Sequence, residues 1–358
     1  MARIEVVSHR EKRAELLALN HETFRPGVSL ETWAWKYEQN PLVAGEPTCI
    51  VAAEDGRIVG SRPIVPCEVW VGQEKTRAFF LADTSVHPAY QGRGIWWQMN
   101  MFALDHYRRE GYSFLWTFPG PKAAPGNLKQ GFTHVLSPET LFRPINWKNL
   151  VSWKMESRLA ATILAFLGHS LLRTREGTYA AEALSSVRLY DEYPDALAEI
   201  NILLHPGRIE LVRSEEFLRW LFDRRPERRH QYVLGWDSGR LCAYAVTAVY
   251  QQEGVTFGGI VDCLVRDDDP GYLQALVGEC LRVLAEEDVD VCYVRLAGQP
   301  LLRRELMQRF GFRSSAGFPF NRVGTPGNFF VRELDPAIVR KANIFDPDNW
   351  RLTEAYTG

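Results

Sequence analysis

The sequence predicts an α/β protein of the α+β kind, built from two similar units in tandem. Three observations lead to this prediction. Short apolar and aromatic runs, such as AFFLADTSV at 78–86, are typical of buried strands. Runs with apolar residues at helical spacing, such as 95–110, indicate amphipathic helices. The order of these segments also recurs in the second half of the chain, which favours a duplicated unit.

Composition restricts the function classes before any motif is considered. The chain has 358 residues, of which 46% are hydrophobic and 24% charged, as in ordinary globular proteins. A formal net charge of −2 gives no electrostatic reason to expect a nucleic-acid partner. The six cysteines have no CxxC spacing, so we expect buried thiols, a cytoplasmic location and no metal site. The N-terminal residues lack a signal-peptide pattern, and no run of about 18 apolar residues predicts a membrane span.

The first elements read as a helix followed by an antiparallel meander. Residues 33–41, WAWKYEQNP, place three aromatic side chains close together. Core packing is their expected role, and contact with a sugar or an apolar part of the acceptor is the alternative. EDGRIVG at 54–60 is a hairpin signal around Asp55 and Gly56. VPCEVWVG at 65–72 and the run at 78–86 continue the meander as strands.

A glycine-rich turn, HPAYQGRG at 87–94, leads from the last of these strands into a helix. The helix is indicated by one apolar face, formed by Ile95, Met99, Phe102, Ala103 and His106. Gly111 is expected to end this helix, and YSFLWTF at 112–118 follows as another strand.

The turn lies at the start of a helix, where glycines can let the backbone bind a ligand. A helix N-terminus leaves amide N–H groups unpaired and carries partial positive charge, and glycine lets backbone approach a ligand closely. The turn is therefore a candidate phosphate site, with Arg93 adding a full charge. An ordinary glycine-rich connection is the alternative, and it is the commoner meaning of QGRG alone. The candidate residues are Gln91, Gly92, Arg93, Gly94, Ile95 and Trp96.

In its context, VHPAYQGRGI resembles the pyrophosphate loop of the GCN5-related N-acetyltransferases (GNAT). One departure is Trp96, where that family has a small residue. PGNLKQGF at 125–132 is similar to the family's later helix, and the resemblance covers about residues 1–145. It implies a mixed, mostly antiparallel sheet flanked by helices, and acetyl-CoA or another acyl-CoA as cosubstrate.

The second half repeats this order without the loop. Trp35 aligns with Trp220, and FLADTSV at 80–86 aligns with GIVDCLV at 259–265. Where the first half has HPAYQGRG, the second has RDDDPG at 266–271, whose three aspartates would repel a pyrophosphate. We therefore expect tandem acyltransferase folds with a degenerate C-terminal half.

These matches predict four parts of the chain. Residues 1–145 form the acyl-CoA-binding domain, and 186–332 form the degenerate second domain. Residues 146–185 are a linker with an apolar helix around 159–172, and 333–358 are a docked extension.

The resemblance also implies where the chemistry takes place. The thioester carbonyl would meet a backbone amide near Ser85 and Val86, pre-aimed at the developing oxyanion. Asp83 is the nearest carboxylate and a candidate general base. Asp262 occupies the matching place in the half without a loop, which favours a structural role for both.

Two more residues complete the candidate site. Asn127 aligns with the tyrosine that serves the family as general acid, so it is a candidate to contact the pantetheine or thiol. His134 follows the Gly-Phe signature and is either a proton donor in the cleft or a strand residue.

Three functions remain open. The first is an N-acetyltransferase that acts on an amine of a small molecule, an amino sugar or a peptide. The second is an aminoacyl transferase of the peptidoglycan-bridge type, against which the intact QGRG loop argues. The third is a non-catalytic acyl-CoA-binding protein, consistent with the missing tyrosine. The acceptor and a homodimeric state are left open.

Overall fold

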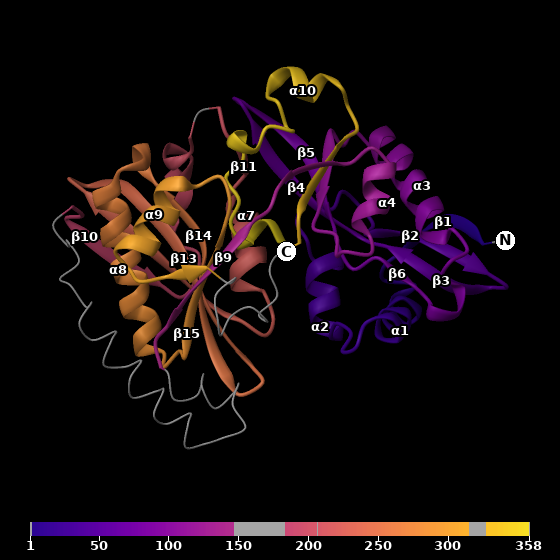
Figure 1. Ribbon diagram of the computed structural model, residues 1–358, viewed down its shortest axis with the longest axis horizontal. Helices are drawn as coiled ribbons and strands as arrows, with labels where there is room; N and C mark the ends of the chain where they lie inside the picture. Colours follow the sequence, from indigo (N-terminus) through magenta and orange to yellow (C-terminus); the bar gives the residue numbers. More distant parts are fainter. Residues whose placement is uncertain (1, 147–182, 206, 315–326, 358) are drawn as a thin grey trace.

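The computed structural model describes residues 2–146, 183–205, 207–314 and 327–357. Two lobes lie side by side, each with strands and flanking helices, and the C-terminal residues lie between them (Figure 1). This confirms the predicted α+β class with two units. The linker helix expected around 159–172 falls outside the described residues.

The first lobe contains the predicted elements in the predicted order, and strand β1 and a π turn after α2 are additions. Its elements are β1 Arg3–Ser8, α1 Arg13–Thr23, α2 Leu30–Trp33, η1 Ala34–Glu38, β2 Thr48–Glu54, β3 Arg57–Arg62, β4 Ile64–Val71, β5 Glu74–Leu81, β6 Ser85–Val86, η2 Pro88–Tyr90, α3 Ile95–Arg109, β7 Phe114–Thr117, α4 Ala124–Lys129 and β8 Thr133–Leu136. The β2–β3 hairpin turns at Asp55 and Gly56, whose φ angles are 51° and 75°. Gly111, with φ 81°, follows the end of α3 as predicted.

The expected single strand over 78–86 is wrong in one respect, because it is broken at 82–84. Asp83 has φ 47°, a left-handed conformation that Asp tolerates better than most residues. As a result β5 joins one sheet and β6 another. The four-stranded sheet has the order β1-β2-β3-β6, and the six-stranded sheet has the order β11-β4-β5-β7-β17-β8.

The second lobe repeats the plan around one seven-stranded sheet, β10-β12-β13-β14-β15-β9-β16. Its elements are β9 Glu139–Pro144, β10 Ser186–Tyr190, η3 Asp195–Leu203, α7 Glu215–Leu218, η4 Arg219–Asp223, β12 Arg229–Asp237, β13 Arg240–Gln252, β14 Val255–Val265, η5 Arg266–Asp268, α8 Pro270–Glu286, β15 Val291–Leu296, α9 Pro300–Gln308 and β16 Arg313–Ser314. Strand β11, Ile209–Leu211, pairs with β4 of the first lobe instead. The parallel pair β14/β15 corresponds to β5/β7 of the first lobe. The C-terminal elements are β17 Phe329–Glu333, α10 Ala337–Lys341, η7 Pro347–Asn349 and η8 Glu354–Thr357.

The two lobes exchange strands. Strand β9 leaves the first lobe and lies between β15 and β16. Strand β17 returns from the end of the chain and lies between β7 and β8. The six-stranded and seven-stranded sheets therefore each include a strand from the other half of the chain. The predicted domain divisions at residues 145 and 332 did not include this exchange. Those divisions stay predictions.

The duplication is clearest where α2 and α7 begin. Ser29 and Ser214 each cap a helix by accepting a backbone N–H three residues on. Each of these short helices passes into a π turn, η1 or η4. Trp35 and Trp220, one on each π turn, stack with centroids 5.1 Å apart. Each indole N–H donates to the backbone oxygen of the other tryptophan at 2.7 Å.

The C-terminal residues are part of the core. Trp350, Leu352 and Tyr356 are each no more than 2% exposed. Leu352 pairs with Ala297 at the end of β15. Trp116 of β7 donates its indole N–H to the backbone oxygen of Tyr356 at 3.1 Å. The docked extension predicted for 333–358 thus contacts both lobes. Within the described ranges, no helix has the length and apolarity needed to cross a membrane.

Candidate functional site

The QGRG turn has the predicted place, between β6 and α3. Gly92 and Gly94 have φ angles of 79° and 75°, which only glycine adopts without strain. A side-chain carbon added at Gly92 would meet no atom within 4 Å. Gly92 is therefore required by the backbone conformation, and the space beside it is open.

The residues of the turn lie at the surface. Residues 91 to 94 are all exposed, and Gly94 is the N-cap of the 15-residue helix α3, without a side-chain cap. The side-chain amide of Gln91 holds the turn against β6 by donating to the backbone oxygen of Val86 at 3.1 Å. Arg93 lies over the Tyr90 ring at 4.7 Å and 3.8 Å from a Glu54 oxygen. This geometry can bind phosphate groups through the helix N-terminus.

The strands beside the turn diverge. The parallel pair β5/β7 ends at Leu81 and Thr117, after which β6 pairs with β3 instead. Ser85 and Val86 form β6, the last strand of its sheet in the part of the chain that the structure describes. Strand β6 therefore pairs with β3 alone in this sheet, and both of its residues are buried.

Asp83 lies at the break between β5 and β6, where it contacts two residues of η1. Tyr37 donates its hydroxyl to Asp83 at 2.5 Å, and the Lys36 ammonium lies 3.1 Å from the same oxygen. Burial opposes ionisation of this carboxyl. The charge of Lys36 and the two hydrogen bonds outweigh burial, so the pKa of Asp83 lies below its ordinary value. Burial, and then the Asp83 charge, raise the pKa of Tyr37 well above its ordinary value.

Asp262, at the matching place of the second lobe, has a different environment. Arg213 binds it through two bonds of 2.8 and 2.9 Å, and Thr353 of the tail donates to it at 3.0 Å. Asp262 is 1% exposed, whereas the Asp83 side chain is 26% exposed. The second carboxylate is fully enclosed, and the first is reachable.

Of the remaining candidate residues, Asn127 and Trp96 lie at helix α4, and His134 lies apart on strand β8. Asn127 is 3% exposed on α4, and its side-chain oxygen has no hydrogen-bond partner among the described residues. Trp96 packs on α4 so closely that a side chain at Gly126 would lie 2.7 Å from its ring. His134 is exposed on the edge strand β8, where its Nε2 lies 3.0 Å from the Leu136 oxygen. Two strands separate β8 from β5, so the structure does not bring His134 to Asp83.

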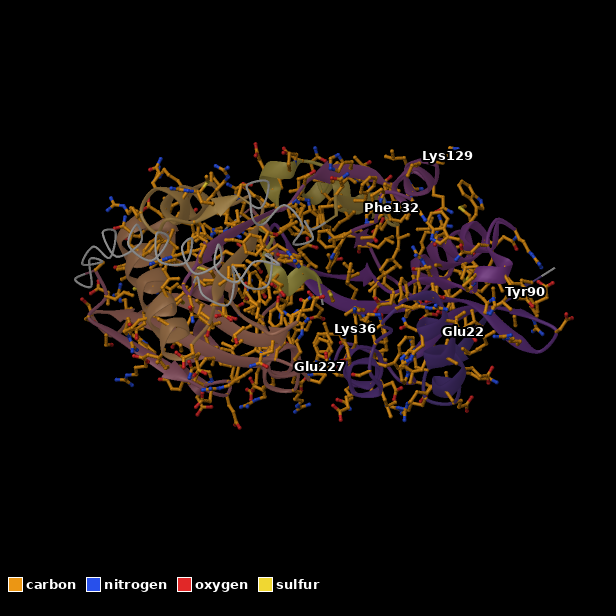
Figure 2. The ribbon with its side chains drawn as sticks, turned by 60° about the horizontal axis from the view of Figure 1, so that its bottom comes forward. Glu22, Lys36, Tyr90, Lys129, Phe132 and Glu227 are labelled. Atoms are coloured by element: carbon orange, nitrogen blue, oxygen red, sulfur yellow. The ribbon has the colours of Figure 1, made fainter. Side chains whose placement is uncertain are left out.

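The loop and the Asp83 group occupy different sides of the first lobe. In Figure 2, Tyr90 lies toward the outer end of the molecule, whereas Lys36 lies near its middle, close to Glu227 of the second lobe. Ser29 and Thr32 of the first lobe both donate to Glu227, at 3.0 and 3.2 Å. Lys36 was not predicted as a site residue, and Tyr37 was expected to pack in the core, with substrate contact as the alternative. The only sequence signal for them was their place in the aromatic cluster.

The described residues bring together no group of three or more His, Cys, Asp or Glu side chains suited to a metal ion. All six cysteines are buried and unpaired, as predicted.

Comparisons with known proteins agree with this geometry. The sequence profile of the acetyltransferase (GNAT) domain matches residues 10–134, which include the loop. No curated protein matches the sequence.

Solved structures match over both lobes. A GCN5-related N-acetyltransferase from Anabaena variabilis is 12% identical, with a TM-score of 0.63 over 94% of this chain and 74% of that chain. A tandem GNAT protein from the clavulanic acid biosynthesis pathway is 14% identical, with a TM-score of 0.51 over 93% and 99%. The N-myristoyltransferase of Saccharomyces cerevisiae, with bound myristoyl-CoA, is 11% identical, with a TM-score of 0.56 over 92% and 82%.

At these identities the structural matches establish the fold, and the profile match over the first lobe establishes the domain type. Residues 10–134 therefore match the acetyltransferase (GNAT) domain, and the chain as a whole has the fold of tandem GNAT proteins.

Proposed function

We propose that the protein transfers an acetyl or related acyl group from acyl-CoA to an amine of a small molecule, an amino sugar or a peptide. The observation that supports this most directly is the QGRG turn. It combines two positive-φ glycines, four exposed residues and the start of a long helix. Such a turn suits a pyrophosphate, which is the part that all acyl-CoA donors share.

The donor would lie along the gap between β6 and the segment after β7. Its pyrophosphate binds the amides of residues 91–96, and its extended arm pairs with the edge of β6 that faces away from β3. The unpartnered oxygen of Asn127 accepts a hydrogen bond from the arm or the thiol. The backbone around Ser85 and Val86 then polarises the thioester carbonyl.

Transfer proceeds by direct attack of a neutral amine on the thioester carbon. The new C–N bond forms, the C–S bond breaks, and the thiolate leaves. Asp83, held ionised by Lys36, attracts the ammonium form of the acceptor and takes a proton from it directly or through water. With Asn127 in place of tyrosine, water returns a proton to the thiolate.

The loop assignment is tested by substitution of its glycines. Gly92→Asp and Gly94→Asp each place a side chain and a negative charge beside the pyrophosphate. We expect loss of CoA binding in calorimetry with native circular dichroism. Gly254→Asp is the matched control, because Gly254 has the same φ of 79° and open space around it, but lies in a hairpin of the second lobe.

Turnover separates the proposal from its alternatives. An acetyltransferase releases CoA in the presence of one member of a panel of amines, and Gly94→Asp abolishes this release. A non-catalytic binder would bind CoA and acylate none of the amines. CoA affinity unchanged in both loop variants would contradict the site assignment itself.

A further inference from the structure

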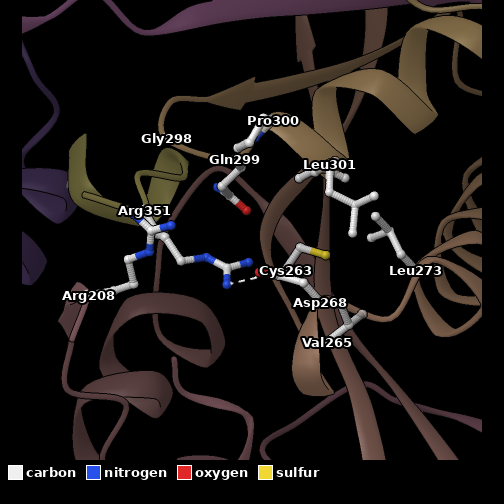
Figure 3. Close-up of a pocket in the computed structure, with 11 residues that line it drawn as sticks. Arg208, Cys263, Val265, Asp268, Leu273, Gly298, Gln299, Pro300, Leu301 and Arg351 are labelled. Carbon is white, nitrogen blue, oxygen red and sulfur yellow. Dashed lines mark ion pairs between the residues drawn. The ribbon is translucent and has the colours of Figure 1, made fainter. Parts of the chain in front are cut away.

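A pocket in the second lobe lies at the place that the QGRG turn has in the first (Figure 3). Cys263 and Val265 of β14, Leu273 of α8 and the segment from Gly298 to Leu302 line it. In each lobe a strand ends, a 3₁₀ turn follows and a long helix begins. The pocket has a cavity volume of about 60 Å³, which suits a ligand of only a few atoms.

The backbone amides at this helix start are already used. Asp269 caps α8 by accepting from the Gly271 and Tyr272 N–H groups at 2.8 and 2.9 Å. Pro270, the first residue of the helix, has no N–H to offer. A ligand here would therefore be held by side chains rather than by a nest of amides.

The tail of the chain fills the gap that an acyl-CoA arm would need. Strands β14 and β15 part after Ile260 and Val294. Leu352 pairs with Ala297 through two backbone bonds, of 2.9 and 3.1 Å, and Thr353 binds Asp262. The second lobe therefore keeps a pocket at the phosphate end of its groove and lacks room for the rest of CoA.

Two arginines supply positive charge to this pocket. Arg351 of the tail has a side chain only 9% exposed, and its Nε has no hydrogen-bond partner among the described residues. Its other end donates to His205 Nδ1 and pairs with Asp268 at 3.2 Å, the contact drawn in Figure 3. Arg208 enters the pocket half-buried, and within the described residues its side chain forms no ion pair or hydrogen bond.

Three charged residues line the pocket, and two of them are arginines. Asp268 provides one carboxylate against the two guanidinium groups, and it is shared between Arg351 and His205. Burial, and then the charge of Arg351, lower the pKa of His205, which keeps its imidazole neutral at pH 7. Burial raises the pKa of Cys263 to about 12, so its thiol stays protonated and adds no negative charge.

We infer that the second lobe binds a small oxyanion, a phosphate or a carboxylate, between Arg208 and Arg351. Guanidinium groups match the geometry of both anions, and the unpartnered Arg351 Nε gains an acceptor on binding. Because Arg351 belongs to the tail, the anion also holds the tail to the end of β14. The site is distinct from the acyl-CoA site of the proposed function and does not depend on it.

Titration calorimetry of the full chain with inorganic phosphate, and separately with acetate, tests this inference at constant ionic strength. We expect one saturable site per chain for at least one of the two anions, and the anion that binds identifies the ligand class. Arg208→Gln should weaken binding by about tenfold or more, as loss of a charge-assisted hydrogen bond implies. Arg240→Gln, an exposed arginine of the same lobe, is the matched control and should bind as the wild type does.

The loop of the first lobe is a competing anion site, so the titration is repeated with Gly94→Asp. Binding that persists in Gly94→Asp and weakens in Arg208→Gln supports the inference. Binding lost in Gly94→Asp and kept in Arg208→Gln would place the anion at the loop, which overturns the inference and leaves the proposed function standing. No saturable binding of either anion by the wild type at millimolar concentrations also overturns it.

Discussion

Asp83 and Asp262 show at the residue scale that a shared position does not imply a shared role. Both were recognised in sequence because FLADTSV aligns with GIVDCLV, and the alignment favoured a structural role for both. The structure encloses Asp262 between an arginine and the tail, whereas Asp83 keeps a reachable oxygen beside Lys36 and Tyr37. Those partners lie 46 and 47 residues away in the chain, so no local pattern could name them.

Replacement of Asp83 by Asn tests how much its ion pair stabilises the fold. Asn tolerates the left-handed backbone, so the change removes the charge and leaves the turn intact. We expect a loss of about 1–3 kcal/mol in the free energy of unfolding at pH 7, the scale of a hydrogen bond to a charged group. Urea denaturation measures it. Asp105→Asn serves as the control. It removes an exposed ion pair with Arg109 on α3 and should change the free energy of unfolding little.

The same variant has a defined pH dependence. The folded pKa of Asp83 is depressed, so its contribution is present above the unfolded pKa and is lost as pH falls through the folded pKa. The stability difference between wild type and Asp83→Asn should therefore shrink below about pH 4, near the ordinary pKa of Asp. A difference that stays constant from pH 7 to pH 3 would contradict the ion-pair explanation.

At the scale of elements, the periodic patterns predicted the regular pieces and missed the irregular ones. Helix α3 begins and ends as expected, although its buried face contains Asn100 and Tyr107 rather than Phe102 and His106. The π turns η1 and η4 have no sequence signature of their own, since a π turn differs from an α turn by one inserted residue. Conservation of their geometry in both lobes is explained by the reciprocal bonds of Trp35 and Trp220.

Trp35→Phe and Trp220→Phe should destabilise the protein by similar amounts. Each removes one indole N–H and leaves a buried carbonyl without its donor, at a cost of about 1–3 kcal/mol, with a further cost for the smaller ring. Denaturant unfolding of the single and double variants measures the loss and the coupling between the stacked rings. Trp97→Phe, 41% exposed on α3, is the control. If Trp35→Phe or Trp220→Phe unfolds at the same denaturant concentration as the wild type, the reciprocal pair does not hold the lobes together.

For the whole molecule, the sequence predicted two lobes and did not predict their strand exchange. The β9 and β17 runs look like ordinary strands, and nothing local selects the sheet they join. Strand β9 pairs with β15, about half the chain away, and β17 pairs with β7 and β8 across a similar distance. The loop residues could be found in sequence because their chemistry is local. The junction of the lobes could not, because it depends on pairings between distant segments.

The strand exchange predicts that neither half folds alone but that the two halves assemble from separate chains. Residues 1–164 lack β17, which fills the space between β7 and β8, so this fragment should be insoluble by itself. Coexpressed with residues 165–358, it should copurify, because each fragment supplies a strand to the other's sheet. Val331→Pro in the second fragment removes a backbone donor from a strand paired on both sides, and should abolish copurification. Arg188→Pro, on the edge strand β10 of the same fragment, should preserve it. A soluble, folded fragment 1–164 on its own would mean that β17 is dispensable and that the lobes are independent domains.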